Sequence, residues 1–242
     1  VEIDGYGKLA LNIKTKLPTQ EIPQIDGSLD IASANIKITE TNQSLTGIRG
    51  HLEWTQNTLN WSKVNFNYLD TSYASEGRMK NFLSPLIDLE LSSAELKLKS
   101  NILLNHELIK ISALEGKYFN STISLSGTID TSQSKAIYAD INADLDIDLK
   151  DLEKPLAKFK DQLEKIKPSG TIKARLNLNG NINDLKSAQG HLRLESSSLS
   201  LYGLKPEEFL LDYHQANRLA DIPLARISLY DGSIDANAKV NL

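Results

Sequence analysis

Four aspartates that alternate along one short segment are the first residues whose type and spacing could do chemistry. Asp140, Asp144, Asp146 and Asp148 occupy even positions of residues 136–149, and in an extended strand side chains two residues apart lie about 7 Å from each other on one face. This spacing would permit paired-carboxylate catalysis or calcium binding. Calcium, however, prefers oxygens that converge in a loop, and a glycosidase pair works in a cleft. We therefore expect a solvated outer face, and a carbohydrate- or calcium-binding protein is the third-ranked hypothesis.

Other signatures of catalysis or metal binding are missing from the sequence. The histidines stand singly, without a His-x-His or HExxH spacing, and there is no nucleophile elbow or P-loop. The chain contains no cysteine, which excludes disulfides, thiol chemistry and cysteine zinc sites. We therefore expect no enzyme activity, no metal and no cofactor. The histidines are His51, His106, His191 and His214.

The charge balance argues against nucleic acid as a partner. The 27 Lys and Arg residues face 31 Asp and Glu residues, a net charge of -4, so there is no basic excess to neutralise phosphates. No stretch approaches the roughly 18 apolar residues of a membrane helix, and no signal peptide is visible. Because the chain starts at Val1 rather than Met, we expect it to be a fragment or mature segment of a longer protein.

The odd positions of residues 137–149 are apolar without exception. Such a period of two predicts a strand with an aliphatic stripe on one side, about 40 Å long at 3.3 Å per residue. Aromatic residues make up only 6% of a chain that is 40% hydrophobic, so the predicted stripes are mainly aliphatic. The stripe consists of Ile137, Ala139, Ile141, Ala143, Leu145, Ile147 and Leu149.

The same alternation recurs along most of the chain and predicts a meander of antiparallel strands joined by short polar turns. Segments 61–77, 109–127 and 225–242 share the form strand, tight turn, strand, which is a weak internal repeat. Turns are predicted at residues 70–72, 105–107, 115–116, 179–181 and 231–232. Bulges or bends inside strands are predicted at residues 62–63, 92–93 and 196–198, where the alternation slips.

Residues 151–167 form the one segment with helical spacing. Asp151 can cap the predicted amphipathic helix, Pro155 falls in its tolerated first turn, and Pro168 with Gly170 ends it. This helix either covers the mouth or end of an apolar groove as a lid, or packs on the convex side for stability. Its apolar side consists of Leu152, Leu156, Phe159, Leu163 and Ile166.

Residues 168–204 resemble the repeating segments of the AsmA-like family, the AsmA, TamB and YhdP type of envelope protein. The shared sequence pattern begins with P-S-G-T-I-K-A-R-L-N-L-N-G-N-I-N-D-L, continues through G-H-L-R-L and ends with the motif L-Y-G-L. The stretch from Glu76 to Leu98 and the terminal I-S-L-Y-D-G-S-I-D-A-N-A-K-V-N-L resemble two further units of the family. The similarity extends over most of residues 45–242.

The resemblance implies a fold and a location. The implied sheet is elongated, curled and mainly antiparallel, a β-taco with an apolar concave face. With the predicted amphipathic helix, which departs from the family's repeat, the expected fold is all-β with one helix. We expect a single β-groove domain over residues 1–242, with the helix between sheet portions 1–149 and 169–242. The family implies the periplasmic portion of a bacterial envelope protein that is anchored in the inner membrane through segments outside this chain.

The resemblance also implies lipid transport without catalysis. Phospholipid or another acyl lipid would bind along the groove and pass between inner and outer membrane in outer-membrane biogenesis, with outer-membrane or envelope proteins as further partners. The alternative is a non-catalytic structural β-module, such as an envelope scaffold or adhesin. The predicted groove residues are Val64, Phe66, Leu89, Leu91, Ile123, Leu125, Ile137, Ile141, Leu145, Ile147, Leu176, Leu192, Leu194, Ile234 and Val240.

Overall fold

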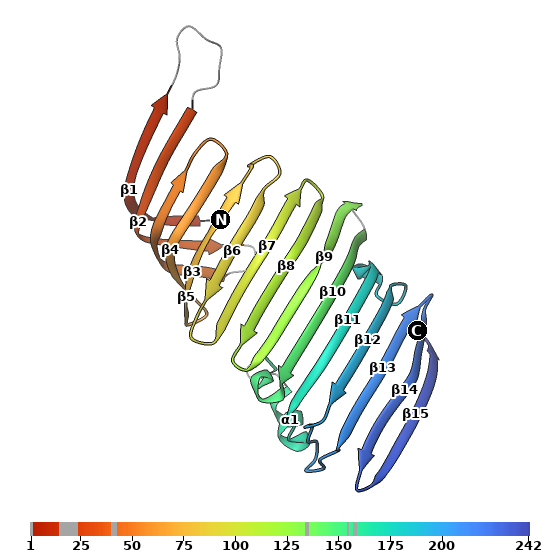
Figure 1. Ribbon diagram of the computed structural model, residues 1–242. Coiled ribbons are helices and arrows are strands. Elements are labelled where there is room, and N and C mark those ends of the chain that lie inside the picture. Colours follow the sequence, from red (N-terminus) through yellow and green to blue (C-terminus); the bar gives the residue numbers. More distant parts are fainter. Residues whose placement is uncertain (1, 15–23, 40–42, 134–135, 154, 157–158) are drawn as a thin grey trace. The chain divides into compact units, whose positions relative to one another are not determined.

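The computed structural model describes residues 2–14, 24–39, 43–133, 136–153, 155–156 and 159–242 (Figure 1). The described chain is mainly antiparallel β-structure with a few short helices. It divides into two compact units, Val1–Asn105 and His106–Leu242. In each unit the strands follow one another in the order of the chain, as the short predicted links require.

Unit 1 is an antiparallel meander in which each described strand pairs with the next. Its strands are β1 (Glu2–Lys14), β2 (Gln24–Ile38), β3 (Gln43–Trp54), β4 (Thr58–Tyr68), β5 (Thr71–Lys80), β6 (Leu86–Ser92) and β7 (Leu96–Asn105).

Unit 2 continues the same design, again with antiparallel pairs of consecutive strands. Its strands are β8 (Leu108–Tyr118), β9 (Ser121–Gln133), β10 (Ala136–Asp148), β11 (Thr171–Asn181), β12 (Gln189–Ser196), β13 (Glu208–Ala216), β14 (Leu219–Leu229) and β15 (Gly232–Asn241). Its helices are η1 (Leu149–Leu152), α1 (Lys160–Ile166) and η3 (Ile182–Asp184). The predicted antiparallel meander is thus confirmed within each unit, and β10 covers almost all of the predicted 136–149 strand.

Three hairpins turn through two residues that both have positive φ, the type I′ geometry that matches the twist of paired strands. The turns are Leu69-Asp70, Asn217-Arg218 and Tyr230-Asp231, so two of the predicted turns lie slightly off their true positions. Two other predicted turns, at residues 115–116 and 179–181, were wrong and fall inside β8 and β11. Gly180 permits close packing there, because a Cβ on it would lie 2.8 Å from the Ala188 Cα.

Of the three predicted slips, only that at residues 62–63 is a bulge, where the β4–β5 register shifts between Trp61 and Val64. The other two predictions were wrong, since β6 ends at Ser92 and β12 ends at Ser196. At the end of β6 the hydroxyl of Ser93 takes the place of the strand hydrogen bonds. The Ser93 Oγ accepts from the backbone N–H groups of Glu95 (3.2 Å) and Leu96 (3.0 Å).

The single helix predicted over residues 151–167 was also wrong, because the described part of this segment forms the short helices η1 and α1. Asp148, not Asp151, caps η1 through its side chain. Asp151 instead accepts hydrogen bonds on its Oδ2 from the Asn120 N–H (2.9 Å), the Ser121 N–H (2.8 Å) and the Ser121 hydroxyl (2.7 Å). Pro155 has no N–H to donate to the Asp151 carbonyl four residues earlier, which stops propagation of the first turn.

The buried apolar residues are few and mostly small. The chain exposes 16418 Å², whereas a compact monomer of 26.8 kDa would expose about 11,000 Å². None of the large side chains in the described ranges is fully buried, as expected where a sheet has no second layer packed on it. The buried apolar residues are Ile48, Ala139, Ala143, Ala174, Ala188, Leu199 and Ala220.

Candidate functional site

Apolar residues of unit 2 are aligned in rows that cross the strands. Residues directly opposite each other in an antiparallel pair point to the same face. One row is Ile123, Leu145, Ala174, Leu194, Leu211, Ala225 and Ala236. The next row is Leu114, Leu125, Ala143, Leu176, Leu192 and Tyr213. A third contains Ile111, Gly127, Ile141 and Leu178.

The alanines at the centre of these rows are buried, whereas the large residues are not and Ala236 on β15 is exposed. Ala143 and Ala174 are only 6% and 3% exposed, because longer side chains flank them on both neighbouring strands. Leu145, Leu176 and Leu194 remain partly exposed. The rows therefore leave aliphatic surface uncovered by the described chain.

The opposite side of the same strands is polar and charged. Asp144 lies across from Arg175, with 3.5 Å between its Oδ1 and the arginine Nε, and Asn177 donates to Asn142 at 2.5 Å. Within the described ranges, the aspartates of β10 join no cluster of three side chains that could hold a metal ion. The polar residues opposite these aspartates support the expected solvated face.

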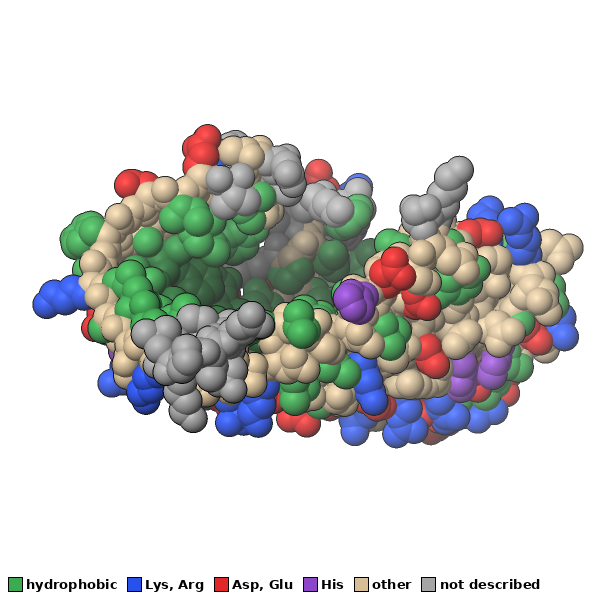
Figure 2. Space-filling model, turned by 90° about the horizontal axis from the view of Figure 1, so that it is seen from above, with side chains coloured by type: hydrophobic (Ala, Val, Ile, Leu, Met, Phe, Trp, Pro, Cys, Tyr) green, Lys and Arg blue, Asp and Glu red, His purple; other side chains and the backbone are tan. Residues whose placement is uncertain are grey.

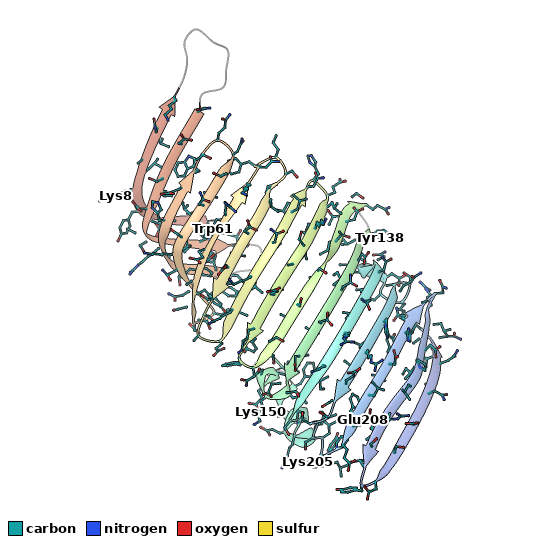
Figure 3. The ribbon with its side chains drawn as sticks, viewed as in Figure 1. Lys8, Trp61, Tyr138, Lys150, Lys205 and Glu208 are labelled. Atoms are coloured by element: carbon teal, nitrogen blue, oxygen red, sulfur yellow. The ribbon has the colours of Figure 1, made fainter. Side chains whose placement is uncertain are left out.

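Unit 1 also aligns apolar residues across strands, but it uses aromatic rings over glycine. A Cβ on Gly77 would lie 2.3 Å from the Cζ2 of Trp61, which is labelled in Figure 3, and a Cβ on Gly27 would lie 2.3 Å from the same atom of Trp54. Trp61 donates from its Nε1 to the Ser75 hydroxyl at 3.0 Å. One row is Leu9, Leu29, Leu52, Trp61, Gly77 and Leu89.

The four predicted groove residues of unit 1 lie on the side that carries Trp61. Val64 pairs with Ser75 and Phe66 with Tyr73, whose rings stack at 5.5 Å between centroids. Leu91 pairs with both Ser75 and Leu98. Figure 2 shows hydrophobic side chains gathered on the inside of a hollow at the left, where Figure 1 places the first strands.

The predicted groove residues of unit 2 also fall on one side of its strands, with different degrees of cover. Ile147 pairs with Ile172, Ile234 with Ile227, and Val240 with Ala220. Ile234 and Val240 on β15 are 68% and 53% exposed, so they are the least covered of the set. Ile137 shares the face by alternation, but the β9–β10 register shifts beside it. The remaining members, Ile123, Leu125, Ile141, Leu145, Leu176, Leu192 and Leu194, lie in the rows above.

Sequence reasoning missed several residues of these rows. Leu178, Leu211 and Trp61 belong to these rows but were not among the predicted groove residues. All three lie in segments with alternating apolar residues, so alternation alone could have placed them on the groove side. The pairs of residues that face each other across strands could not be predicted without knowing the register of strand pairing. Alternation marks a side of a strand, whereas the row depends on the pairing of strands.

The predicted lid residues lie at one end of the strands of unit 2. Figure 1 shows α1 at the lower ends of β10 and β11 in that view. The Ile166 carbonyl accepts a hydrogen bond from the Tyr202 N–H at 2.6 Å, which attaches the end of α1 to the chain after β12. Leu152 and Leu156 are partly exposed, Phe159 is 44% exposed, and the side chain of Leu163 lies outside the described set. A lid role stays a prediction.

Among the ionisable side chains with shifted pKa values, His51 and Asp151 link separate segments of the chain. The hydrogen bonds of His51 to Glu53 (3.0 Å) and Asp30 (2.6 Å) raise its pKa above 6.5. Burial of Asp151 opposes its ionisation, but its hydrogen bonds from Ser121 and Asn120 outweigh that effect and lower its pKa below 3.8. Both groups link segments that are distant in the chain through hydrogen bonds.

Comparisons with known proteins identified no relative of this chain. Among the described residues, no helix is long and apolar enough to cross a membrane. No match to the chain was found among family models, curated proteins or solved structures.

Proposed function

We propose that this chain binds the acyl chains of phospholipids along its apolar rows and passes them between the inner and outer membranes of a bacterial envelope, without catalysis. The observation that carries the proposal is the alignment of partly exposed aliphatic residues from strand to strand in unit 2. The resemblance of residues 168–204 to AsmA-like repeats supplies the envelope location and the phospholipid class.

Acyl chains match such a surface physically. Burial of hydrocarbon contributes about 0.8 kcal/mol per CH₂ and needs no directional chemistry, so a fourteen-carbon tail could gain about 10 kcal/mol before ordering costs. Smooth aliphatic side chains suit this task, because the tail can slide without breaking hydrogen bonds. The headgroup would stay in water beside the polar ends of the strands.

The finer shape that we propose is an elongated, curled sheet whose apolar side is concave. Support comes from the hollow in Figure 2, whose inner wall is hydrophobic over the first strands while charged side chains lie outside. Bulges support it as well, since an extra residue in one strand increases local bend and twist.

Retention of lipid tests the proposal directly. The chain is purified from bacterial cells without detergent and examined by native mass spectrometry for bound phospholipid. In Ile141→Asp/Leu145→Asp, carboxylates placed in the rows must be desolvated against acyl chains, so we expect at least tenfold lower occupancy. The control is Asn142→Asp, which places one carboxylate on the same strand but on the polar side, and should keep its lipid.

Two results would contradict the proposal. Unchanged occupancy in a folded double variant would place lipid elsewhere. Failure of the unaltered chain to retain phospholipid, or to take it up from vesicles, would favour the structural β-module. Transfer is separated from binding by following a fluorescent phospholipid from donor to acceptor vesicles, which a binding module alone would not accelerate.

A further inference from the structure

We propose that His191, Asp212 and His214 form a binding site for a first-row divalent transition-metal ion, of which Zn²⁺ fits the donor set well. The site lies on the polar side of unit 2, across the strands from the apolar rows. It does not depend on lipid binding.

Three donor atoms converge in this cluster. The Nε2 of His191 lies 2.7 Å from the Asp212 Oδ1, and the Nε2 of His214 lies 3.1 Å from the same oxygen. All three ligand atoms lie within 4.8 Å of one another. A metal bonded at about 2.0–2.1 Å to each donor separates neighbouring donors by about 3 Å, so small side-chain rotations would admit the ion.

Strand pairing pre-forms the cluster. His191 of β12 is directly opposite His214 of β13, and Asp212 lies two residues before His214 on the same face. The two imidazole rings stack at 4.3 Å between centroids with 8° between their planes, so both Nε2 atoms reach one carboxylate oxygen. A metal would therefore link two adjacent strands without reorganising the backbone.

The chemistry of the donor set favours a borderline metal over calcium. Two imidazole nitrogens and one carboxylate match Zn²⁺, Ni²⁺ or Co²⁺, whereas Ca²⁺ and Mg²⁺ prefer oxygen ligands. Neutral histidines can carry their proton on Nδ1, which frees Nε2 as a ligand. The Asp212 and His214 side chains are 22% and 49% exposed, so water or an external ligand could complete the coordination.

The neighbours of the cluster leave this position open. Arg193, which is opposite Asp212, hydrogen-bonds Glu195, and Asp221, opposite His214, pairs with Lys239 at 3.2 Å. A concavity of about 480 Å³ is lined by His191, His214 and Asp221, among other residues. It offers space beside the two imidazoles, although Asp212 is not among its lining residues.

No spacing motif marks this site in the sequence, because His191 is 23 residues from His214. Only Asp212-x-His214 is local, and on a strand that spacing places both side chains on one face. The third ligand comes from the β12–β13 register.

Titration of Zn²⁺ into the chain, purified without a polyhistidine tag, tests the site. We expect one Zn²⁺ per chain with micromolar or tighter affinity and a higher melting temperature on binding. His214→Gln should weaken binding at least tenfold, and His191→Gln/His214→Gln should abolish both the binding and the thermal shift. Circular dichroism establishes that the variants fold, and Ca²⁺ should produce no comparable shift.

His51→Gln is the matched control. His51 also contacts two carboxylates, but through opposite ring nitrogens, so its partners cannot converge on one ion, and Zn²⁺ affinity should not change. Absence of micromolar binding in the unaltered chain would overturn the proposal. Equal binding by the folded double variant would do the same.

Discussion

The two units build the same kind of apolar rows in different ways. In unit 1 every strand pair from β1 to β5 contains at least one register shift, and tryptophan rings lie over glycines. In the middle of unit 2 the pairs from β10 to β13 run without a shift, although the flanking pairs β8–β9, β9–β10, β13–β14 and β14–β15 each contain one. In this middle part leucine and isoleucine flank buried alanines. Alternation is common to both units. Regular pairing yields a continuous aliphatic surface, whereas repeated bulges bend the sheet and call for larger side chains to fill it.

The largest expected change in the free energy of unfolding comes from replacing one row residue in each unit and comparing the two. Trp61→Ala should destabilise the chain by about 3 kcal/mol, because the ring fills the space over Gly77 and donates to Ser75. Leu145→Ala should cost about 1 kcal/mol, since its side chain is already partly in water. Urea denaturation followed by circular dichroism measures both. Equal costs would mean that the rows of unit 2 are packed as tightly as those of unit 1.

A pair of glycine substitutions sharpens the same contrast. A Cβ on Gly77 would lie 2.3 Å from both the Trp61 ring and the Asp88 carbonyl oxygen, whereas a Cβ on Gly190 would have no contact closer than 3.8 Å. Gly77→Ala should therefore cost about 2 kcal/mol, and Gly190→Ala should change stability by less than about 1 kcal/mol. Melting temperatures give the comparison. An unchanged melting temperature in Gly77→Ala would contradict the close packing of the Trp61 ring over Gly77.

Asp151 tests a long-range link within unit 2. Asp151→Asn should lower stability by about 1.5 kcal/mol at neutral pH, because a buried carboxylate loses charge-assisted hydrogen bonds. The folded pKa of Asp151 lies below 3.8, so its contribution is present above that pH and is lost as pH falls through the folded value. Denaturation at pH 7 and pH 3 should show the difference between the two proteins shrinking in acid. A constant difference would contradict this role.

His51 is expected to give the smallest effect, on the polar side of unit 1. Its folded pKa lies above 6.5, so its stabilising bonds to Glu53 and Asp30 are complete below about pH 6.5 and weaken as pH rises through the folded value. The melting temperature should therefore depend slightly less on pH in His51→Gln than in the unaltered chain. His106→Gln is the control. An NMR titration that places the His51 pKa at or below 6.5 would refute the assignment.

The strands were largely predictable because their information is local. A period of two in residues 136–149 is sufficient to place β10, since any pairing register leaves the alternate side chains on opposite faces. Polar turns were harder, because Gly116 and Gly180 lie inside strands instead of turning the chain, and Gly180 permits close approach to the Ala188 backbone. The predicted aspartate face and aliphatic stripe needed nothing beyond alternation.

By itself the sequence determined the antiparallel meander, its alternating faces and the absence of cysteine chemistry. Tertiary structure decided the contacts between residues that are distant in the chain. Asp151 leaves the expected helix cap because the Asn120–Ser121 turn offers it three donors, and Pro155 cannot extend the helix. His191 and His214 meet only through the β12–β13 register. Periodicity constrains which way a side chain points, whereas cross-strand pairing selects its neighbours, and that selection rests on contacts that no local pattern encodes.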